Sequence, residues 1–391
     1  MKIRKLKKKE RFDAYMISAY CFHMRVEDPE AERPKQEAAK VEDWGAFADD
    51  GSLMARIINN SYEFYIDGTL VKAGGIGAVS TLPEYRDSGA VKEIFRALIP
   101  AAYKNGEVIS TLFPFKHAFY RKAGYETVTY MNEYTFGPAT LKDYRFDGKV
   151  IKWNAGDSLE DFLGVYNEFA PKYNFAATRD EKTMLEHVKA EKPLMDRKFS
   201  YVLKKGGKAI AYVIFTDIRH DPGAILKVEE CAWVNRDGFN GILGFLARFE
   251  ADYGEIKLAL PRGIDLLRII RSANAYGITK TTYQSFMVRV INAKKLLETI
   301  RKPVGCDFTV KVTDDLIEEN NRTYRVKSDS VTESKRSKVD IELSVLALGQ
   351  MATGAVNFDE ALLKGDVTLN SNEDMLRSVF KEKNIFVGEH F

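Results

Sequence analysis

The stretch from Val79 to Tyr125 constrains the fold more tightly than the rest of the sequence. Small and β-branched residues lead to Pro83, which ends a strand because proline has no N–H to donate to a ladder. After a polar loop, apolar residues recur at helical spacing, at Val91, Ile94, Phe95, Leu98, Ile99 and Ala102. The apolar run from Val108 to Phe113 predicts a second strand. The stretch therefore predicts one β-loop-α-β unit.

The polar loop of this unit is a candidate anion site. Residues 84–89 read Glu-Tyr-Arg-Asp-Ser-Gly and directly precede the helix, where free N–H groups and the helix dipole favour negative charge. Arg86 to Val91 fits the pattern Arg/Gln-x-x-Gly-x-Gly/Ala except at Val91. Its backbone N–H groups would wrap a pyrophosphate, with Arg86 adding positive charge. No Walker lysine-serine pair is present, which disfavours a nucleoside triphosphatase. A solvated turn is the simpler interpretation of the loop taken alone.

Composition indicates a globular protein and excludes several function classes. The chain has 391 residues, of which 45% are hydrophobic and 29% charged, as in a globular protein of two or three domains. A net charge of +3 gives no electrostatic case for a nucleic-acid partner, and no apolar run approaches the roughly 18 residues of a membrane span. The odd count of cysteines, Cys21, Cys231 and Cys306, favours a reducing, cytoplasmic setting. The histidines form no metal-binding motif, so we expect no metal.

The chain divides into three predicted units of α+β or mixed α/β structure. The first unit, residues 1–145, contains the opening stretch, and Asn59–Asn60 and Asp67–Gly68 predict turns between its strands. The second unit, residues 146–285, repeats the order hairpin, strand, helix, strand, which indicates a weak internal repeat. The third unit, residues 286–391, alternates strands with short helices.

The second unit lacks the residues that would carry chemistry in the first. Where the first unit has its polar loop, the second has Asn235 to Gly241, with Phe239 in place of the glycine. After the following strand the first unit reads Pro-Phe-Lys-His-Ala-Phe-Tyr to Tyr120, and the second has no tyrosine in the corresponding segment. The repeat is therefore predicted to be structural, with a single active site in the first unit.

The strand, the loop and the segment Phe-Tyr-Arg-Lys-Ala-Gly-Tyr from Phe119 to Tyr125 resemble the Gcn5-related N-acetyltransferases (GNAT), and more closely their Eis ("enhanced intracellular survival") branch. Members of that branch carry two tandem acetyltransferase-like domains and a C-terminal sterol-carrier-protein-like domain. The resemblance implies an acetyl-CoA-dependent N-acetyltransferase without a metal. It implies a primary amine as acceptor, either an aminoglycoside, a polyamine or a lysine, and a ring-like homohexamer.

The resemblance also implies roles for individual residues. Val79, Ser80 and Thr81 would bind the pantetheine arm as an added strand, residues 87–92 would wrap the pyrophosphate, and Phe115 and Lys116 would line the far side. The implied cofactor-binding residues are Val79, Ser80, Thr81, Arg86, Asp87, Ser88, Gly89, Ala90, Val91, Lys92, Phe115 and Lys116. Tyr120 would be the general acid, and the C-terminal carboxylate of Phe391 the general base.

These two groups suit the proton transfers that acyl transfer to an amine requires. A proton leaves the ammonium group, and another is given to the departing thiolate. A tyrosine with a pKa of about 10 donates almost thermoneutrally to a thiolate whose conjugate acid has a pKa of about 8.5. An α-carboxylate with a pKa of about 3.5 is a poor base for an amine unless burial raises that pKa or water relays the proton. The ring of Phe391 could anchor the chain end in the core.

Other interpretations of these residues stay open. Tyr120 could be a packed aromatic beside Phe119, and His117 could touch substrate or be a hydrogen-bonded structural residue. Glu27 and Asp28 could form an acidic wall for a cationic amine or be merely solvated. The competing function class is a non-enzymatic carrier that binds lipid in the third unit, with both acetyltransferase-like units degenerate.

Overall fold

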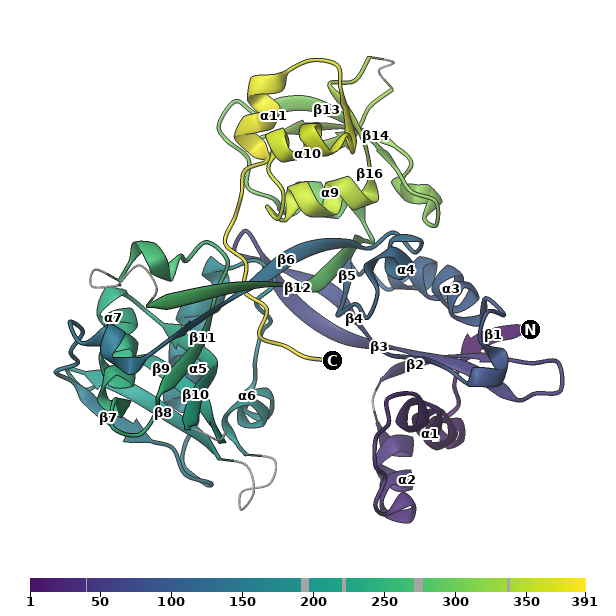
Figure 1. The fold of residues 1–391 in the computed structure, drawn as a ribbon. Helices are drawn as coiled ribbons and strands as arrows, with labels where there is room; N and C mark the ends of the chain where they lie inside the picture. The colour runs from purple at the N-terminus through teal and green to yellow at the C-terminus, as the bar shows by residue number, and fades with distance from the viewer. Residues whose placement is uncertain (40, 191–196, 220–222, 271–276, 336–337) are drawn as a thin grey trace.

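Twelve strands form one continuous sheet across the first and second units (Figure 1). The computed structural model describes residues 1–39, 41–190, 197–219, 223–270, 277–335 and 338–391. Within them the strand order is β1-β2-β3-β4-β5-β12-β6-β11-β10-β9-β8-β7. The strands are β1 (Lys2–Lys5), β2 (Glu42–Phe47), β3 (Leu53–Ile66), β4 (Thr69–Thr81), β5 (Ile109–Leu112), β6 (Glu126–Phe136), β7 (Lys149–Lys152), β8 (Lys198–Lys205), β9 (Lys208–Arg219), β10 (Ala224–Trp233), β11 (Glu255–Leu260) and β12 (Ile278–Val290).

Helices cover this sheet in both units. The first unit has α1 (Arg11–Cys21), α2 (Pro29–Ala38), α3 (Ala90–Lys104) and α4 (His117–Arg121); the second has α5 (Glu160–Phe169), α6 (Glu181–Val188) and α7 (Arg236–Leu246). The apolar face predicted for α3 is confirmed, because every residue named for it is buried against the sheet. The local period of 3.6 residues was sufficient for this prediction.

Strand β12 connects the two units within the sheet (Figure 1). It pairs antiparallel with β6 along most of its length and with β5 at its end, from Met287 to Val290. The boundary expected between the second and third units, after residue 285, falls inside this strand. The first half of β12, from Ile278 to Tyr283, is rich in threonine and has no apolar alternation, so the pattern did not reveal it.

In its described residues the third unit is a separate five-stranded sheet that packs with four α-helices (Figure 1). The strand order is β15-β14-β13-β16-β17, with β13 and β16 parallel. Its elements are α8 (Ala293–Thr299), β13 (Asp307–Thr313), β14 (Thr323–Lys327), β15 (Val331–Glu333), β16 (Ile341–Ser344), α9 (Val345–Ala352), α10 (Phe358–Lys364), β17 (Val367–Leu369) and α11 (Glu373–Val379). Its apolar core is continuous with β12, since Val288 and Val290 belong to the same buried cluster as Leu348 and Met351 of α9.

The turn predicted at Asn59–Asn60 is wrong, because β3 continues through both residues. Asn59 pairs with Ile76 of β4, and its side-chain Nδ2 donates to Glu107 Oε1 at 3.0 Å. The Asn60 side chain donates to the carbonyl oxygen of Gly75. Partners inside the fold satisfy both amides, so neither residue needs to leave the strand. The turn predicted at Asp67–Gly68 is confirmed; both residues have positive φ, and they join β3 to β4.

Glu107, beside Asn59, makes stability depend on pH. Its side chain is 5% exposed, and burial raises its pKa to about 7. A raised folded-state pKa adds stability at pH values below the unfolded-state pKa, and this contribution is lost as the pH rises through about 7. The difference corresponds to about 3 kcal/mol. We therefore expect wild-type stability to fall between about pH 5 and pH 8, and Glu107→Gln to remove most of that fall.

Urea unfolding of both proteins at the two pH values measures this effect. Glu168→Gln, at an exposed position of α5, is the matched control and should keep the wild-type pH dependence. Equal pH dependence in wild type and Glu107→Gln would show that Glu107 is ionised throughout this range.

Candidate active site

Strands β4 and β5 are paired over part of their length and then separate. Their parallel ladder runs from Ala73–Ile109 to Ile76–Leu112. Beyond it, residues 77–81 have β3 as their strand partner within the described sheet, and the register against β3 shifts near Ala78, whose φ is 51°. The other edge of residues 77–81 is therefore open to an added strand. Val79, Ser80 and Thr81, predicted to bind pantetheine, lie on this segment.

The loop between β4 and α3 exposes its backbone. Arg86, Asp87, Ser88 and Gly89 are exposed, and Lys92 is exposed in the first turn of α3. Asp87 and Gly89 adopt left-handed φ values of 63° and 79°, and Gly89 is the N-cap residue of α3. The N–H of Ala90 makes a long hydrogen bond of 3.4 Å to Ser88 Oγ, and the other N–H groups of the first helical turn favour an anion. Ala90 and Val91 are buried, so the valine that departs from the motif points into the core.

Tyr120 lies in α4, which follows β5 through the connection that holds Phe115 and Lys116. Phe115 is 70% exposed and Lys116 is exposed, whereas Tyr120 is 3% exposed. The Tyr120 ring packs edge-on against the rings of Phe115 and Phe119, at centroid distances of 5.3 and 5.1 Å, and also against Phe95 and Tyr125. Its ring is therefore a packed aromatic, as the simpler interpretation held. Its hydroxyl has no hydrogen-bond partner among the described residues.

Burial raises the pKa of the Tyr120 hydroxyl well above its usual value. The phenol consequently stays protonated at every working pH. Proton transfer from it to a thiolate is more uphill than the nearly thermoneutral transfer expected from the sequence. The geometry suits a hydroxyl that donates a hydrogen bond as negative charge develops on sulfur.

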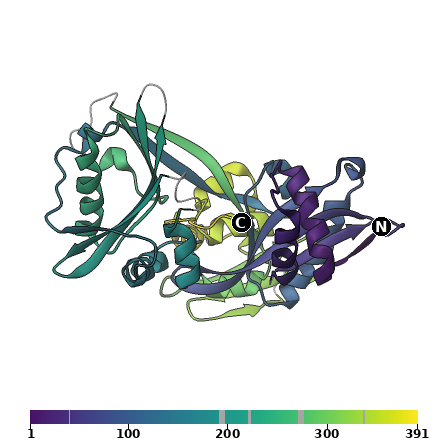
Figure 2. The same ribbon diagram turned by 90° about the horizontal axis from the view of Figure 1, so that it is seen from below.

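The C-terminal tail, residues 384–391, pairs with the second unit at Ile385 and ends beside Gly77 of β4. The chain end lies between the two units (Figure 2). The ring of Phe391 contacts the rings of Tyr62 and Phe113, at 5.1 and 5.4 Å between centroids. A Cβ at Gly77 would lie 3.2 Å from the main-chain carbonyl carbon of Phe391, and one at Gly75 would lie 3.1 Å from its ring. Glycine at both positions lets the chain end approach β4 closely.

The connection between β5 and α4 contacts both Tyr120, the predicted acid, and Phe391, whose carboxylate is the predicted base. Phe113, at the end of β5, contacts Phe391, and Phe115, two residues later, contacts Tyr120. The open edge of β4 lies beside the same chain end. Of the other candidates, Asp28 accepts from the N–H of Ala31 and caps α2, which is a structural role. His117 Nε2 is buried and has no hydrogen-bond partner among the described residues.

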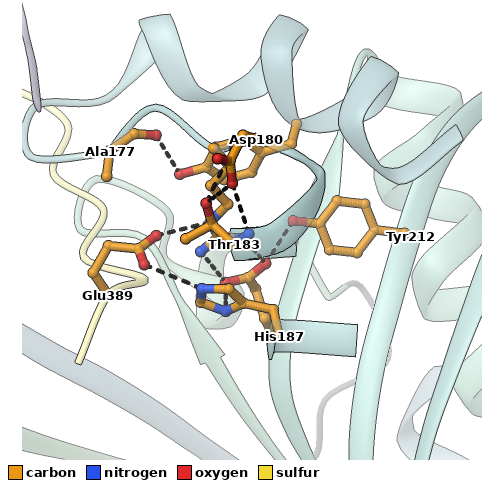
Figure 3. Close-up of polar contacts among 9 residues, drawn as sticks. Ala177, Asp180, Thr183, His187, Tyr212 and Glu389 are labelled. Carbon is orange, nitrogen blue, oxygen red and sulfur yellow. Dashed lines mark hydrogen bonds and ion pairs between the residues drawn. The ribbon is translucent and has the colours of Figure 1, made fainter. Parts of the chain in front are cut away.

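A buried charge cluster holds the tail to the second unit (Figure 3). Arg179, with a fully buried side chain, donates from Nε to Glu389 Oε1 at 2.7 Å. Its two terminal nitrogens donate to Glu230 at 2.7 and 2.8 Å, and Tyr212 also donates to Glu230. His187 Nε2 lies 3.1 Å from Glu389 Oε2. The cluster joins α6, the segment before it, β9, β10 and the tail.

The charges in this cluster compensate for its burial. Burial alone would raise the pKa of Glu230, but Arg179, together with His187 and the hydrogen bond from Tyr212, outweighs it and holds that pKa at about 2. Burial also opposes ionisation of Glu389, yet the hydrogen bond from His187 and the charge of Arg179 lower its pKa. Sequence reasoning missed these residues because Arg179 is 210 positions from Glu389 and 51 from Glu230, with no local pattern that links them.

A cleft with a volume of about 800 Å³ opens beside the tail. Gly388, Glu389 and His390 form one side, and Tyr62, which contacts Phe391, lies at its edge. The carboxylates in its lining are Glu186, Asp217, Glu229, Glu230 and Glu389, and the cations Arg197 and Lys198 oppose them. Arg179 neutralises Glu230 and Glu389, and Arg197 pairs with Asp217. Glu186 and Glu229 pair with the partly exposed lysines Lys189 and Lys227. These two surface pairs are the places in the lining where a cationic molecule can compete for a carboxylate.

In the described part of the chain, three or more His, Cys, Asp or Glu side chains do not converge as a metal site would require. No helix in that part is long and apolar enough to cross a bilayer.

Comparison with protein families defines the class of protein. Residues 2–128 match the acetyltransferase (GNAT) domain, and residues 293–387 match the sterol carrier protein domain. The predicted domains are confirmed: the chain carries an acetyltransferase (GNAT) domain at its N-terminal end and a sterol carrier protein domain at its C-terminal end. No curated protein matches the chain.

Solved structures share the whole fold at low sequence identity. A GCN5-related N-acetyltransferase from Anabaena variabilis is 18% identical with a TM-score of 0.87, and all of both chains is covered. A probable N-acyltransferase from Enterococcus faecalis, described as a conserved protein of unknown function, is 18% identical with a TM-score of 0.86 and 98% of each chain covered. Eis1 from Mycobacterium abscessus is 17% identical with a TM-score of 0.84, and all of both chains is covered. The predicted mixed α/β fold class is confirmed.

Proposed function

We propose that this protein transfers an acetyl group from acetyl-CoA to a cationic primary amine, at one active site in the first unit. The observation that carries the proposal is the position of the Phe391 chain end against Gly77, where β4 and β5 separate. Acetyltransferases of the GNAT class use acetyl-CoA, and three features here fit it. They are the open edge of residues 77–81, the exposed loop at 86–89 and the N-terminus of α3 beside that loop.

The residues of the chain have distinct roles in this proposal. The edge of Val79, Ser80 and Thr81 binds the pantetheine arm, and the N–H groups of residues 87–92 bind the pyrophosphate with Arg86. Phe115 and Lys116 line the far side. The exposure of Phe115, Lys116 and Arg86 leaves all three accessible to a ligand.

The proposed reaction is a direct transfer. The carboxylate of Phe391 accepts a proton from the ammonium group, directly or through a water, and frees the amine lone pair. The amine nitrogen forms the new C–N bond to the acetyl carbonyl carbon, and the C–S bond breaks. After the attack the nitrogen still carries a second proton, which it loses to water. Tyr120 gives its proton to the departing sulfur, and the phenolate regains a proton from solvent. The products are an acetamide, free CoA thiol and one net proton.

The cleft beside the tail is the proposed acceptor site. Glu186 and Glu229, whose lysine partners are partly exposed, favour an amine with additional positive charges, such as a polyamine or an aminoglycoside, and a lysine side chain also fits. The competing carrier function has less support, because Met351 and Phe358 are fully buried in the same apolar cluster as β12. A packed core of this kind suits a structural role for the third unit better than lipid binding. The homohexamer stays a prediction from the resemblance, which light scattering would test.

Thiol release from acetyl-CoA with a panel of amines tests the proposal. We expect release with spermidine or an aminoglycoside and very little with a neutral amino sugar. The double variant Glu186→Gln/Glu229→Gln should raise the KM of the cationic amine about fivefold or more, because two charges at the cleft are lost. The KM for acetyl-CoA should stay constant. Binding of acetyl-CoA by calorimetry without thiol release from any amine would contradict an enzymatic function.

A further inference from the structure

Strands β10 and β11 of the second unit separate in the same way as β4 and β5. Their parallel ladder spans Ile225–Val228 and Glu255–Leu258, and a bulge interrupts β10 between Val228 and Glu230. The tail passes through this opening. The N–H of Arg262 donates to the carbonyl oxygen of Ile385 at 2.9 Å, and the N–H of Ile385 donates back at 3.3 Å. The C-terminal tail of the same chain therefore fills the opening between β10 and β11.

The helix that follows β10 shows no exposed anion-binding loop. The sequence matched Asn235 to Gly241 to the polar loop of the first unit, but α7 begins at Arg236, so most of this segment is helical. The side chain of Asn235 accepts from the N–H of Gly238 and caps the helix. Gly238 packs against the carbonyl oxygen of Ile210, so this glycine serves close packing. The second unit therefore uses its separated strands to hold the tail.

The charge cluster sets the position of the tail within this opening. Gly388 passes directly over the ion pair, since a Cβ there would lie 2.6 Å from Arg179 Nη2 and 3.0 Å from Glu230 Oε2. Glu389 is then bound by Arg179 and His187. Phe391 follows two residues later, which is at most about 7 Å of chain. Movement of Glu389 is therefore transmitted to the carboxylate beside Gly77.

We propose that Arg179 and Glu230 are positioning residues for acetyl transfer, and that they fix the terminal carboxylate through Glu389. The inference rests on the function proposed above. A buried ion pair generally adds little net stability, because desolvation offsets the attraction between its charges. Here the ion pair fixes geometry. Glu230 and Glu389 bind the same guanidinium group, that of Arg179, so the tail can lie in only one position. The second unit accordingly positions the terminal carboxylate of Phe391, which acts in the first unit.

The test uses Arg179→Gln and Gly388→Ala in the full chain. Each variant is assayed for kcat, for the KM of acetyl-CoA and for the rate at which carboxypeptidase releases Phe391 from the native protein. We expect kcat to fall about 10- to 100-fold, as for an active-site group misplaced by about 1 Å. The KM of acetyl-CoA should change less than about twofold, since the hydrogen bonds and ion pairs described for the cluster involve none of the proposed cofactor-binding residues. Release of Phe391 should accelerate about 10-fold or more.

Two controls and one conservative variant make the result specific. Gly164→Ala adds a methyl group where nothing lies within 4 Å, and Lys204→Gln breaks the ion pair with Asp161 in the same unit. Both should leave kcat and the release rate unchanged. Arg179→Lys, which keeps the charge but loses the fork of donors, should recover part of kcat. If Arg179→Gln fails to fold, Gly388→Ala carries the test, because it keeps every charge of the cluster.

The outcomes separate this inference from the function on which it rests. If Phe391 stays protected in both variants, the cluster does not position the tail and the inference is overturned, whatever happens to kcat. If Phe391 is released faster while kcat is unchanged, the cluster does hold the tail, but the terminal carboxylate is not the base. Faster release together with the expected loss of kcat supports both.

Discussion

Replacement of Tyr120 by phenylalanine is expected to lower kcat about 100-fold while the KM for acetyl-CoA stays nearly constant. The change removes one oxygen and keeps the ring, whose contacts with Phe95, Phe115, Phe119 and Tyr125 hold α4 in place. Without the hydroxyl, the sulfur leaves with its negative charge unassisted. Steady-state thiol release and calorimetric binding of acetyl-CoA measure the two effects separately.

Tyr125→Phe is the matched control for this experiment. Tyr125 is fully buried in the same aromatic cluster, and its hydroxyl shares a hydrogen bond of 2.8 Å with Ser110. We expect this variant to lose about 1 kcal/mol of stability from the broken hydrogen bond and to keep its kcat. Similar kcat values for Tyr120→Phe and wild type would remove Tyr120 from the proposed mechanism, and equal losses in both variants would indicate a packing effect.

Addition of two residues after Phe391 is expected to lower kcat at least about 100-fold, because the terminal carboxylate becomes an amide that accepts no proton. The added residues also have little space, since Gly75 and Gly77 already allow close approach of the ring and the chain end. The affinity for acetyl-CoA should change little, because the loop at 86–89 and α3 are untouched. Stopped-flow thiol release and calorimetry measure the two quantities.

The same two residues placed before Met1 provide the control. The amino group of Met1 pairs with the exposed Asp49 at the surface, so an extension there should change neither kcat nor affinity. A C-terminal extension that also leaves kcat unchanged would exclude the carboxylate from the reaction.

Local sequence patterns predicted the parts of the site that lie close together in the chain. The strand, the loop with Gly89 and the apolar face of α3 follow from residue types within about 25 positions, and the resemblance added Tyr120. Where a long-range partner decides the structure, local patterns failed. Asn59 stays in a strand because Glu107 binds its amide, and β12 forms because it lies between β5 and β6.

The tail shows the same limit more strongly. Its aromatic end predicted docking, which the contacts of Phe391 bear out, yet the residues that hold it could not be read from any pattern. Arg179, Glu230 and Glu389 come from three distant segments, and each alone is an ordinary charged residue. Only the fold shows that they meet in a buried cluster.

The most direct test of the proposed base is a semisynthetic protein in which the carboxylate of Phe391 is replaced by a carboxamide. This change leaves the ring, the tail and the charge cluster as they are, and removes one ionisable group. We predict that kcat for the best amine of the panel falls at least about 100-fold while the dissociation constant of acetyl-CoA stays within about twofold. A carboxamide protein with the kcat of wild type would contradict the account.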